Sequence, residues 1–316
     1  MSTAEATMAT ETRPGLAQGV WSPAITPFND DLSPDTARYV AHVKWLLAQG
    51  CHGIAAFGTT SEATSLGMAE RKTLLEALLE AGVAPERLMV GTGLCALPET
   101  VELTAHAAGL GCKSVLMLPP FYYKGVSDQG LFDSYSQVIE RVADPALKIY
   151  FYHFPKLSGV PITAPLIEML ATAYPDNIAG LKDSSGDPAN MSMLIERFPE
   201  LAIFPGSETF LLPMLKQGGA GCITASANAN PKAIRSVWDA FQAGQGDADD
   251  LQARITATRK AIEATPMVPT LKHLVAHYRS DPAWRRVRPP LTALDQAQGD
   301  ALVDVLAGQG FSFDAG

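Results

Sequence analysis

Lys182 stands at the end of a short apolar run, residues 178–182, and is followed by three polar residues. An amine at the end of a buried strand can lose its water shell until its neutral form is available to attack a ketone. A lysine at a strand end can also be a solvated charge at the rim of a sheet. Most other lysines fall in helical patterns or loops, which predicts surface positions for them, Lys272 included. Lys182 is therefore the candidate nucleophile.

A loop of consecutive hydroxyl residues, 58–62 (Gly-Thr-Thr-Ser-Glu), follows another apolar run. Its glycine permits a tight turn, and its hydroxyl and backbone N–H groups can converge on a carboxylate. The same residues could instead form an ordinary turn before a helix that Gly67 and Glu70 cap. The first reading makes Thr59 and Thr60 candidate ligands of an acid.

Tyrosines occur near the ends of two further apolar runs. Tyr122 and Tyr123 come shortly after a Pro-Pro pair that follows the fourth run, and Tyr152 is the last residue but one of the run 148–153. Side chains alternate along a strand, so Tyr152 and His153 are expected on opposite faces. A single tyrosine often only packs, with its hydroxyl bonded locally. Tyr152 is nevertheless a candidate acid or base.

The same alternation places Lys182 and Ser184 on one face, so Ser184 is a candidate ligand for whatever Lys182 binds. Gly206 and Glu208 follow the seventh apolar run, and Ser226 follows the eighth. We expect these residues to meet the distal part of a polar substrate.

Short β-type runs and helical patterns alternate eight times, which is typical of βα units around a parallel sheet. The expected strands are residues 19–24, 53–57, 88–91, 114–118, 148–153, 178–182, 202–205 and 222–224. Several helical patterns end on a glycine suited to a left-handed cap, namely Gly50, Gly82, Gly109 and Gly218. An open doubly wound sheet is the alternative, but the first strand lacks a glycine-rich phosphate loop.

The sequence thus predicts a (β/α)8 TIM barrel over residues 16–244 with a helical C-terminal extension over residues 245–316. Residues 1–15 lack the basic and apolar regions of a signal peptide and are expected to form a disordered tail. Candidate active-site residues in a barrel lie just after the strands, which agrees with the positions singled out above.

Composition limits the classes of partner. A net charge of −9 disfavours nucleic acid and anionic membranes, and no apolar run reaches the roughly 18 residues that cross a bilayer. The four cysteines, Cys51, Cys95, Cys112 and Cys222, have no metal-ligand spacing and are expected as buried thiols in the cytoplasm. His273 and His277 are four apart but fit a helix face better than a zinc site.

Three of these motifs together resemble the dihydrodipicolinate synthase and N-acetylneuraminate lyase family of pyruvate-dependent class I aldolases. Residues 58–62 are similar to its Gly-Thr/Ser-Thr-Gly-Glu motif, residues 152–155 to Tyr-Asn-x-Pro, and residues 180–184 to Gly-x-Lys-x-Thr/Ser. They stand in the family's order, and the resemblance extends from about Gly19 to the C-terminal helices. Ser61 departs from the family's glycine.

The resemblance implies that Lys182 forms a Schiff base with a 2-oxo acid such as pyruvate, that Thr59 and Thr60 hold its carboxylate, and that Tyr152 relays protons. It also implies that Tyr122, or else Tyr123, reaches the site of a neighbouring subunit in a homo-oligomer, a dimer or tetramer. The chemistry needs no cofactor and no metal, since the imine itself accepts electrons.

Leu157 stands where the synthase carries an arginine for its second substrate, so the resemblance is closer to the lyase and sugar-acid aldolase branch. The leading hypothesis is reversible cleavage of a 4-hydroxy-2-oxo acid to pyruvate and an aldehyde. Dehydration of a 2-keto-3-deoxy sugar acid, dihydrodipicolinate synthesis, and a non-catalytic 2-oxo-acid sensor or structural subunit remain as alternatives.

Overall fold

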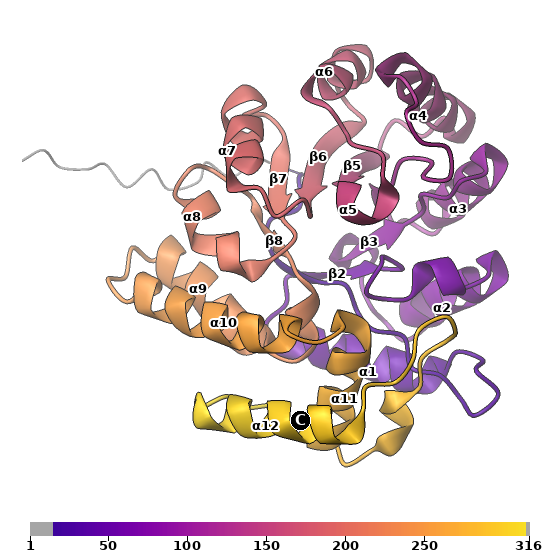
Figure 1. Cartoon of the computed structure of the whole chain (residues 1–316). Helices are drawn as coiled ribbons and strands as arrows, with labels where there is room; N and C mark the ends of the chain where they lie inside the picture. The colour runs from indigo at the N-terminus through magenta and orange to yellow at the C-terminus, as the bar shows by residue number, and fades with distance from the viewer. Residues whose placement is uncertain (1–14, 314–316) are drawn as a thin grey trace, which may run out of the picture.

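Eight parallel strands form the centre of the molecule in the computed structural model, which describes residues 15–313 (Figure 1). The strands are β1 Gly19–Ser22, β2 Gly53–Ala56, β3 Leu88–Gly91, β4 Ser114–Met117, β5 Lys148–His153, β6 Ile178–Asp183, β7 Ala202–Pro205 and β8 Gly221–Ile223. They pair in chain order from β1 to β7, and β8 pairs with β1. Ala220, just before β8, donates to the carbonyl of Ile203 in β7 at 2.9 Å, which joins the two ends of the sheet. The predicted TIM barrel is confirmed.

Helices connect the strands and surround the sheet (Figure 1). They are α1 Thr36–Ala48, α2 Met68–Glu80, α3 Leu97–Gly109, α4 Asp128–Val142, α5 Pro155–Ser158, α6 Ala164–Ala173, α7 Pro188–Arg197, α8 Leu211–Leu215 and α9 Pro231–Gln242. Short 3₁₀ turns include η1 Ala63–Ser65, η2 Pro85–Arg87, η3 Glu208–Phe210 and η4 Ala225–Asn228. Most of the expected tail, residues 1–14, lies outside the described residues.

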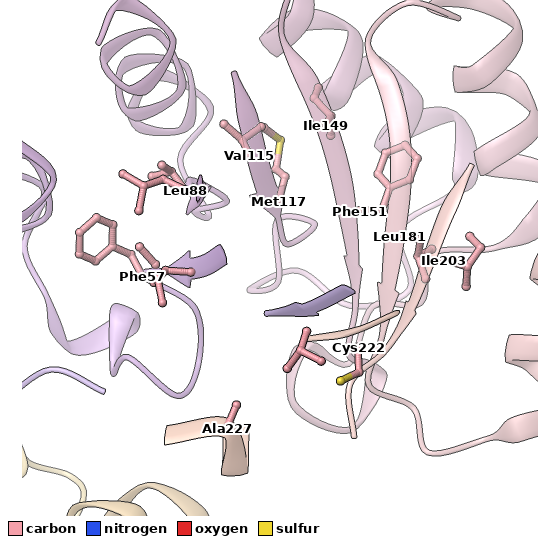
Figure 2. Close-up of a cluster of buried hydrophobic side chains, with 14 of the residues drawn as sticks. Phe57, Leu88, Val115, Met117, Ile149, Phe151, Leu181, Ile203, Cys222 and Ala227 are labelled. Atoms are coloured by element: carbon pink, nitrogen blue, oxygen red, sulfur yellow. The ribbon is translucent and has the colours of Figure 1, made fainter. Parts of the chain in front are cut away.

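Two apolar layers follow from the alternation of side chains along the strands. Figure 2 shows the outer layer, in which Phe151 and Leu181 point from neighbouring strands toward the surrounding helices. The inner layer fills the barrel with side chains of the opposite parity, among them Tyr150, Tyr152 and Phe204. Tyr152 is therefore inward, and its neighbour Phe151 is outward, as the alternation predicts.

Backbone chemistry sets where elements end. Gly50, Gly82 and Gly218 adopt the left-handed conformation expected of them after a helix. The prediction for Gly109 is wrong: α3 includes this residue, and Gly111 takes the positive φ of 88° instead. Strand β1 is two residues shorter than expected, because Pro23 has no N–H to donate to the sheet.

The C-terminal extension contains α10 Ala248–Glu263, α11 Met267–Tyr278, the 3₁₀ turn η5 Pro282–Arg285 and α12 Gln296–Gly308. Its apolar residues share one buried cluster with Ile25, Ala225 and Ala229 of the barrel loops. The extension therefore packs against the edge of the barrel at which the strands end. Within residues 15–313, no helix has the length and apolarity to cross a membrane.

Two predictions of burial are wrong. Lys272 is completely buried rather than on a surface, because α11 lies between the barrel and α12. Cys95 is exposed, whereas Cys51, Cys112 and Cys222 are buried as expected.

Candidate active site

A cavity of about 660 Å³ opens at the carboxyl ends of the strands. Residues that directly follow or end β2, β5, β6 and β7 line it, including Thr59, Tyr152, Lys182 and Gly206. A second cavity, of about 410 Å³, lies at the opposite end of the barrel, where β5 and β6 begin. In TIM barrels the reactive groups gather at the carboxyl ends, so the larger cavity is the candidate site.

Lys182 and Tyr152 lie side by side at the bottom of this cavity. They are paired in register between β6 and β5, so both side chains leave the sheet on its inner face. The Lys182 Nζ lies 4.3 Å from the centroid of the Tyr152 ring, and the two residues are only 4% and 3% exposed. The arrangement holds an amine and a phenol together in a nearly dry place.

Tyr152 also reaches the hydroxyl loop. Its hydroxyl donates to Thr59 Oγ1 at 3.3 Å, and Thr60, 8% exposed, lines the same cavity. This separation is long for a hydrogen bond between hydroxyls. The two hydroxyls form a short chain along which a proton could move.

The loop of residues 58–66 contains only the short 3₁₀ turn η1 and is held to the rest of the molecule by polar contacts. Thr26 donates to the carbonyl of Ser61 at 2.7 Å, and Arg71 donates to the carbonyl of Ala63. Glu62 has a left-handed backbone with a φ of 57°. Such a conformation is strained for a residue with a side chain, so the loop needs external support.

Lys272 of the extension gives this support. Its Nζ forms an ion pair with Glu62, donates to the carbonyl of Arg286 at 2.6 Å and lies 4.3 Å above the ring of Phe28. The backbone N–H of Arg288 donates to the other Glu62 oxygen at 3.0 Å. Burial lowers the pKa of Lys272 to about 8, although Glu62 opposes the shift.

His153 lies on the outer face of β5, away from Lys182. Its Nδ1 accepts from the N–H of Ile162 at 3.0 Å, and burial lowers its pKa while the nearby Asp183 opposes this. Asp183 accepts from Ser185 and Asn190, both at 2.7 Å. These contacts fix the loops after β5 and β6.

Of the expected substrate ligands, Ser184 and Gly206 line the cavity and lie against each other. A Cβ at residue 206 would stand 2.1 Å from Ser184 Oγ, which explains the need for glycine there. Glu208 and Ser226 do not reach the cavity. Glu208 is fully buried and accepts from Thr224 and Ser226.

Tyr122 is not brought to the cavity of its own chain. Its side chain is 75% exposed, and its ring packs edge-on against Tyr123 at 5.4 Å between centroids. Both tyrosines thus lie on the surface beyond the rim.

The sequence analysis missed the contribution of the extension. Arg259 and Glu263 of α10, residues Pro266, Met267, Val268 and Pro269, and Pro290 with Leu291 all line the cavity. Arg259 connects it to the buried network, because its Nη1 lies 3.3 Å from Glu208. No local pattern could have identified these residues, since helical periodicity does not specify where a helix docks.

Metal-binding side chains are scattered. Within residues 15–313, no three His, Cys, Asp or Glu residues are grouped as metal ligands would be. His273 is buried in the extension, and His277 is exposed at its surface.

Comparison with known proteins places this geometry in a family. The model of the dihydrodipicolinate synthetase family matches residues 16–309. An uncharacterised DapA-like lyase of Chloroflexus aurantiacus is 36% identical over 286 residues, covering 90% of this chain and 94% of the relative. A 4-hydroxy-tetrahydrodipicolinate synthase of Agrobacterium fabrum is 31% identical over 282 residues, covering 89% of this chain and 94% of the relative.

Solved structures agree. A dihydrodipicolinate synthase from Agrobacterium tumefaciens superposes with a TM-score of 0.83 at 30% identity, covering 92% of this chain and 99% of the other. YagE, an Escherichia coli prophage protein of the same family crystallised with pyruvate, gives 0.85 at 26% identity, covering 93% and 99%. The family model and these relatives each cover about nine-tenths of the sequence, so the chain is a lyase that belongs to the dihydrodipicolinate synthetase family.

Proposed function

We propose that this protein is a Schiff-base aldolase that reversibly cleaves a 4-hydroxy-2-oxo acid to pyruvate and an aldehyde. The observation that carries the proposal is the buried contact of the Lys182 amine with the Tyr152 ring, 4.3 Å from Nζ to centroid, beside the hydroxyl of Thr59. A nucleophile beside a proton carrier is the arrangement that imine chemistry requires. The pyruvate bound to YagE supports the same class of ligand.

The Lys182 amine attacks the C2 carbonyl of the substrate. The phenol of Tyr152 then gives its proton, by way of the Thr59 hydroxyl, to the oxygen that leaves C2 as water, which yields an iminium ion and leaves Tyr152 as a phenolate. The phenolate takes the proton of the C4 hydroxyl. The C3–C4 bond then breaks, its electron pair moves into the C2–C3 bond as an enamine, and C4 leaves as an aldehyde. Protonation of C3 and hydrolysis of the imine release pyruvate and restore the amine.

The remaining groups are assigned to binding. Thr59 and Thr60, with neighbouring backbone N–H groups, hold the carboxylate, and Ser184 bonds the oxygen that leaves C2 as water. The iminium nitrogen is the electron sink, so the proposed cycle uses neither a metal nor an organic cofactor. The assembly is proposed to be a cytoplasmic homo-oligomer, a dimer or tetramer.

The test is reductive trapping. Incubation with pyruvate and borohydride should attach one reduced pyruvate per chain, on the peptide that contains Lys182. Lys182→Met should abolish the adduct, while Lys156→Met, a change of another lysine in the same cavity, should keep it. An adduct elsewhere, or none, would refute the assignment.

Product analysis distinguishes the reaction from dehydration through the same imine. Cleavage of a 4-hydroxy-2-oxo acid yields pyruvate, whereas loss of water from a 2-keto-3-deoxy sugar acid yields none. Pyruvate detected with lactate dehydrogenase and NADH therefore supports cleavage. Consumption of the substrate without pyruvate would favour the dehydratase.

A further inference from the structure

The wall that the C-terminal extension adds to the cavity is mainly apolar. Met267, Val268 and Pro269 at the start of α11 form one part of it, and Pro290 with Leu291 forms another. Leu291 is 38% exposed although it is a large apolar side chain. Exposed apolar side chains that gather around a cavity indicate a surface that a ligand covers.

The barrel loops continue this apolar surface. Phe154 and Leu157 line the cavity after β5, Met191 lines it from α7, and Phe210 lines it after β7. Leu157 is 64% exposed, so it too presents an uncovered apolar face at the rim. The hydroxyls of the site, by contrast, cluster on the loops that immediately follow the strands around Lys182.

Most charged groups in this cavity already have partners. Glu62 is paired with Lys272, and Asp183 accepts from Ser185 and Asn190. Arg259 lies between Glu208 at 3.3 Å and Glu263 at 3.0 Å. Apart from Lys182 itself, Lys156 is the charged residue of the cavity lining that has no hydrogen bond or ion pair within residues 15–313.

On the side of the cavity after β7, the polar groups that could bind the hydroxyls of a sugar-like tail already have partners. Glu208 uses its oxygens on Thr224, Ser226 and Arg259, and it lies beneath the cavity rather than in it. Ser207 and Thr209 bond each other at 3.0 Å. A polyhydroxylated tail would lose its water against Met267, Val268 and Leu291 without gaining partners, which is unfavourable.

Resting on the proposed imine chemistry, we propose that the substrate half that becomes the aldehyde is apolar, an aryl or branched alkyl group, and that Leu157, Met267 and Leu291 select it. Such a group gains affinity from the apolar area that it covers. A tail ending in a carboxylate is the competing ligand, and Lys156 is the cation that would bind it.

The test uses 2-oxo acids that lack a 4-hydroxyl and so cannot be cleaved. Borohydride trapping on Lys182 is measured against concentration for 2-oxo-4-phenylbutanoate, 5-hydroxy-2-oxopentanoate and 2-oxoglutarate, with pyruvate as reference. We expect half-maximal trapping of the phenyl compound at a concentration at least about tenfold lower than for the other two tails.

Variants of the apolar wall test whether it causes the preference for the phenyl compound. Met267→Gln and Leu291→Ser should each raise the half-trapping concentration of the phenyl compound severalfold to about tenfold and leave that of pyruvate unchanged. Val305→Ser is the matched control, because Val305 is an apolar residue of α12, 52% exposed, that does not line the cavity. It should change neither value.

Equal trapping of the three tails, or preference for the hydroxyl or carboxylate tail, would overturn the inference while leaving the aldolase proposal intact. Failure of every 2-oxo acid, pyruvate included, to label Lys182 would remove the aldolase proposal and this inference with it. Unchanged selectivity in both wall variants would also contradict the role given to the extension.

Discussion

Tyr152 is the residue whose substitution separates imine formation from the later proton transfers. Tyr152→Phe keeps the ring beside Lys182 but removes the hydroxyl that contacts Thr59. We expect turnover to fall about 10²- to 10⁴-fold, as is typical for a lost acid or base, while pyruvate trapping persists. Steady-state rates and trapping measured on the same preparation check this.

Tyr150 provides the control within the same strand. Its hydroxyl accepts from the N–H of Ala17 at 2.8 Å near the other end of the barrel, so Tyr150→Phe removes a buried hydroxyl far from the cavity. It should cost about 1 kcal/mol of stability and leave turnover unchanged. Equal losses of turnover in both variants would reduce Tyr152 to a packing residue.

Leu157 makes a second prediction at the residue scale. It lines the cavity at the position where the resemblance implies an arginine in the synthase, and leucine cannot bind the carboxylate of aspartate semialdehyde. Aspartate semialdehyde should therefore be a poor acceptor, and Leu157→Arg should improve its kcat/KM about tenfold or more. Efficient condensation by the unmodified protein would restore the synthase assignment.

At the scale of elements, the important contact is between α11 and the loop after β2. Lys272 and Glu62 are both completely buried, so removal of one charge leaves the other without compensation. Lys272→Met should lower the free energy of unfolding by about 3–5 kcal/mol, measured by urea denaturation. It should also raise the half-trapping concentration of pyruvate, since Glu62 belongs to the loop that is proposed to hold the carboxylate.

The double variant Lys272→Met with Glu62→Gln separates the effect of the unpaired Glu62 charge from the effect of losing the lysine side chain. Without a buried unpaired carboxylate, much of the lost stability should return. A double variant that is as unstable as Lys272→Met would mean that the long lysine chain acts through packing instead.

The whole molecule should lose stability in acid through His42, which joins the barrel to the extension. Its Nε2 lies 3.0 Å from Asn228 Oδ1 and its Nδ1 lies 3.2 Å from Arg279 Nη2, so the neutral ring fits both partners. Burial, reinforced by Arg279, lowers the pKa of His42 to about 3.

The unfolded chain binds this proton near pH 6.5 and the folded chain only near pH 3, so the stabilisation is complete above pH 6.5 and is lost as the pH falls toward 3. Between pH 7.5 and 4.5 the loss from this one group should be roughly 3 kcal/mol. Urea unfolding of His42→Gln should show a correspondingly smaller loss, whereas the exposed His277→Gln should behave like the parent.

Assembly is the last property of the whole molecule. The exposed Tyr122 is predicted to act in a neighbouring subunit, which requires a dimer or tetramer in size-exclusion chromatography with light scattering. Tyr122→Ala should lower turnover, and mixing it with inactive Lys182→Met chains should restore part of the activity in hybrids. A fully active monomer would exclude this role.

The sequence by itself predicted the barrel and singled out Lys182, Tyr152 and Thr59, which the structure brings together in one cavity. Alternating runs predicted eight strands, and side-chain parity put Tyr152 and His153 on opposite faces of one strand and Lys182 with Ser184 on one face of the next, because these features depend only on neighbours along the chain. Most of the left-handed glycines at helix ends were predicted for the same reason. The prediction for Gly109 was wrong because the left-handed helix cap lies two residues later, at a second glycine, Gly111.

The tertiary structure alone decided which residues surround Lys182, Tyr152 and Thr59. Lys272 is predicted at a surface by its helix yet is buried against Glu62, which lies more than two hundred residues earlier in the chain. Glu208 and Ser226 follow strands as ligands should, but Arg259 of α10 neutralises Glu208 beneath the cavity. Helix periodicity says which face is apolar and not which surface it covers, so only the docked extension could reveal the apolar wall of the cavity that contains Lys182.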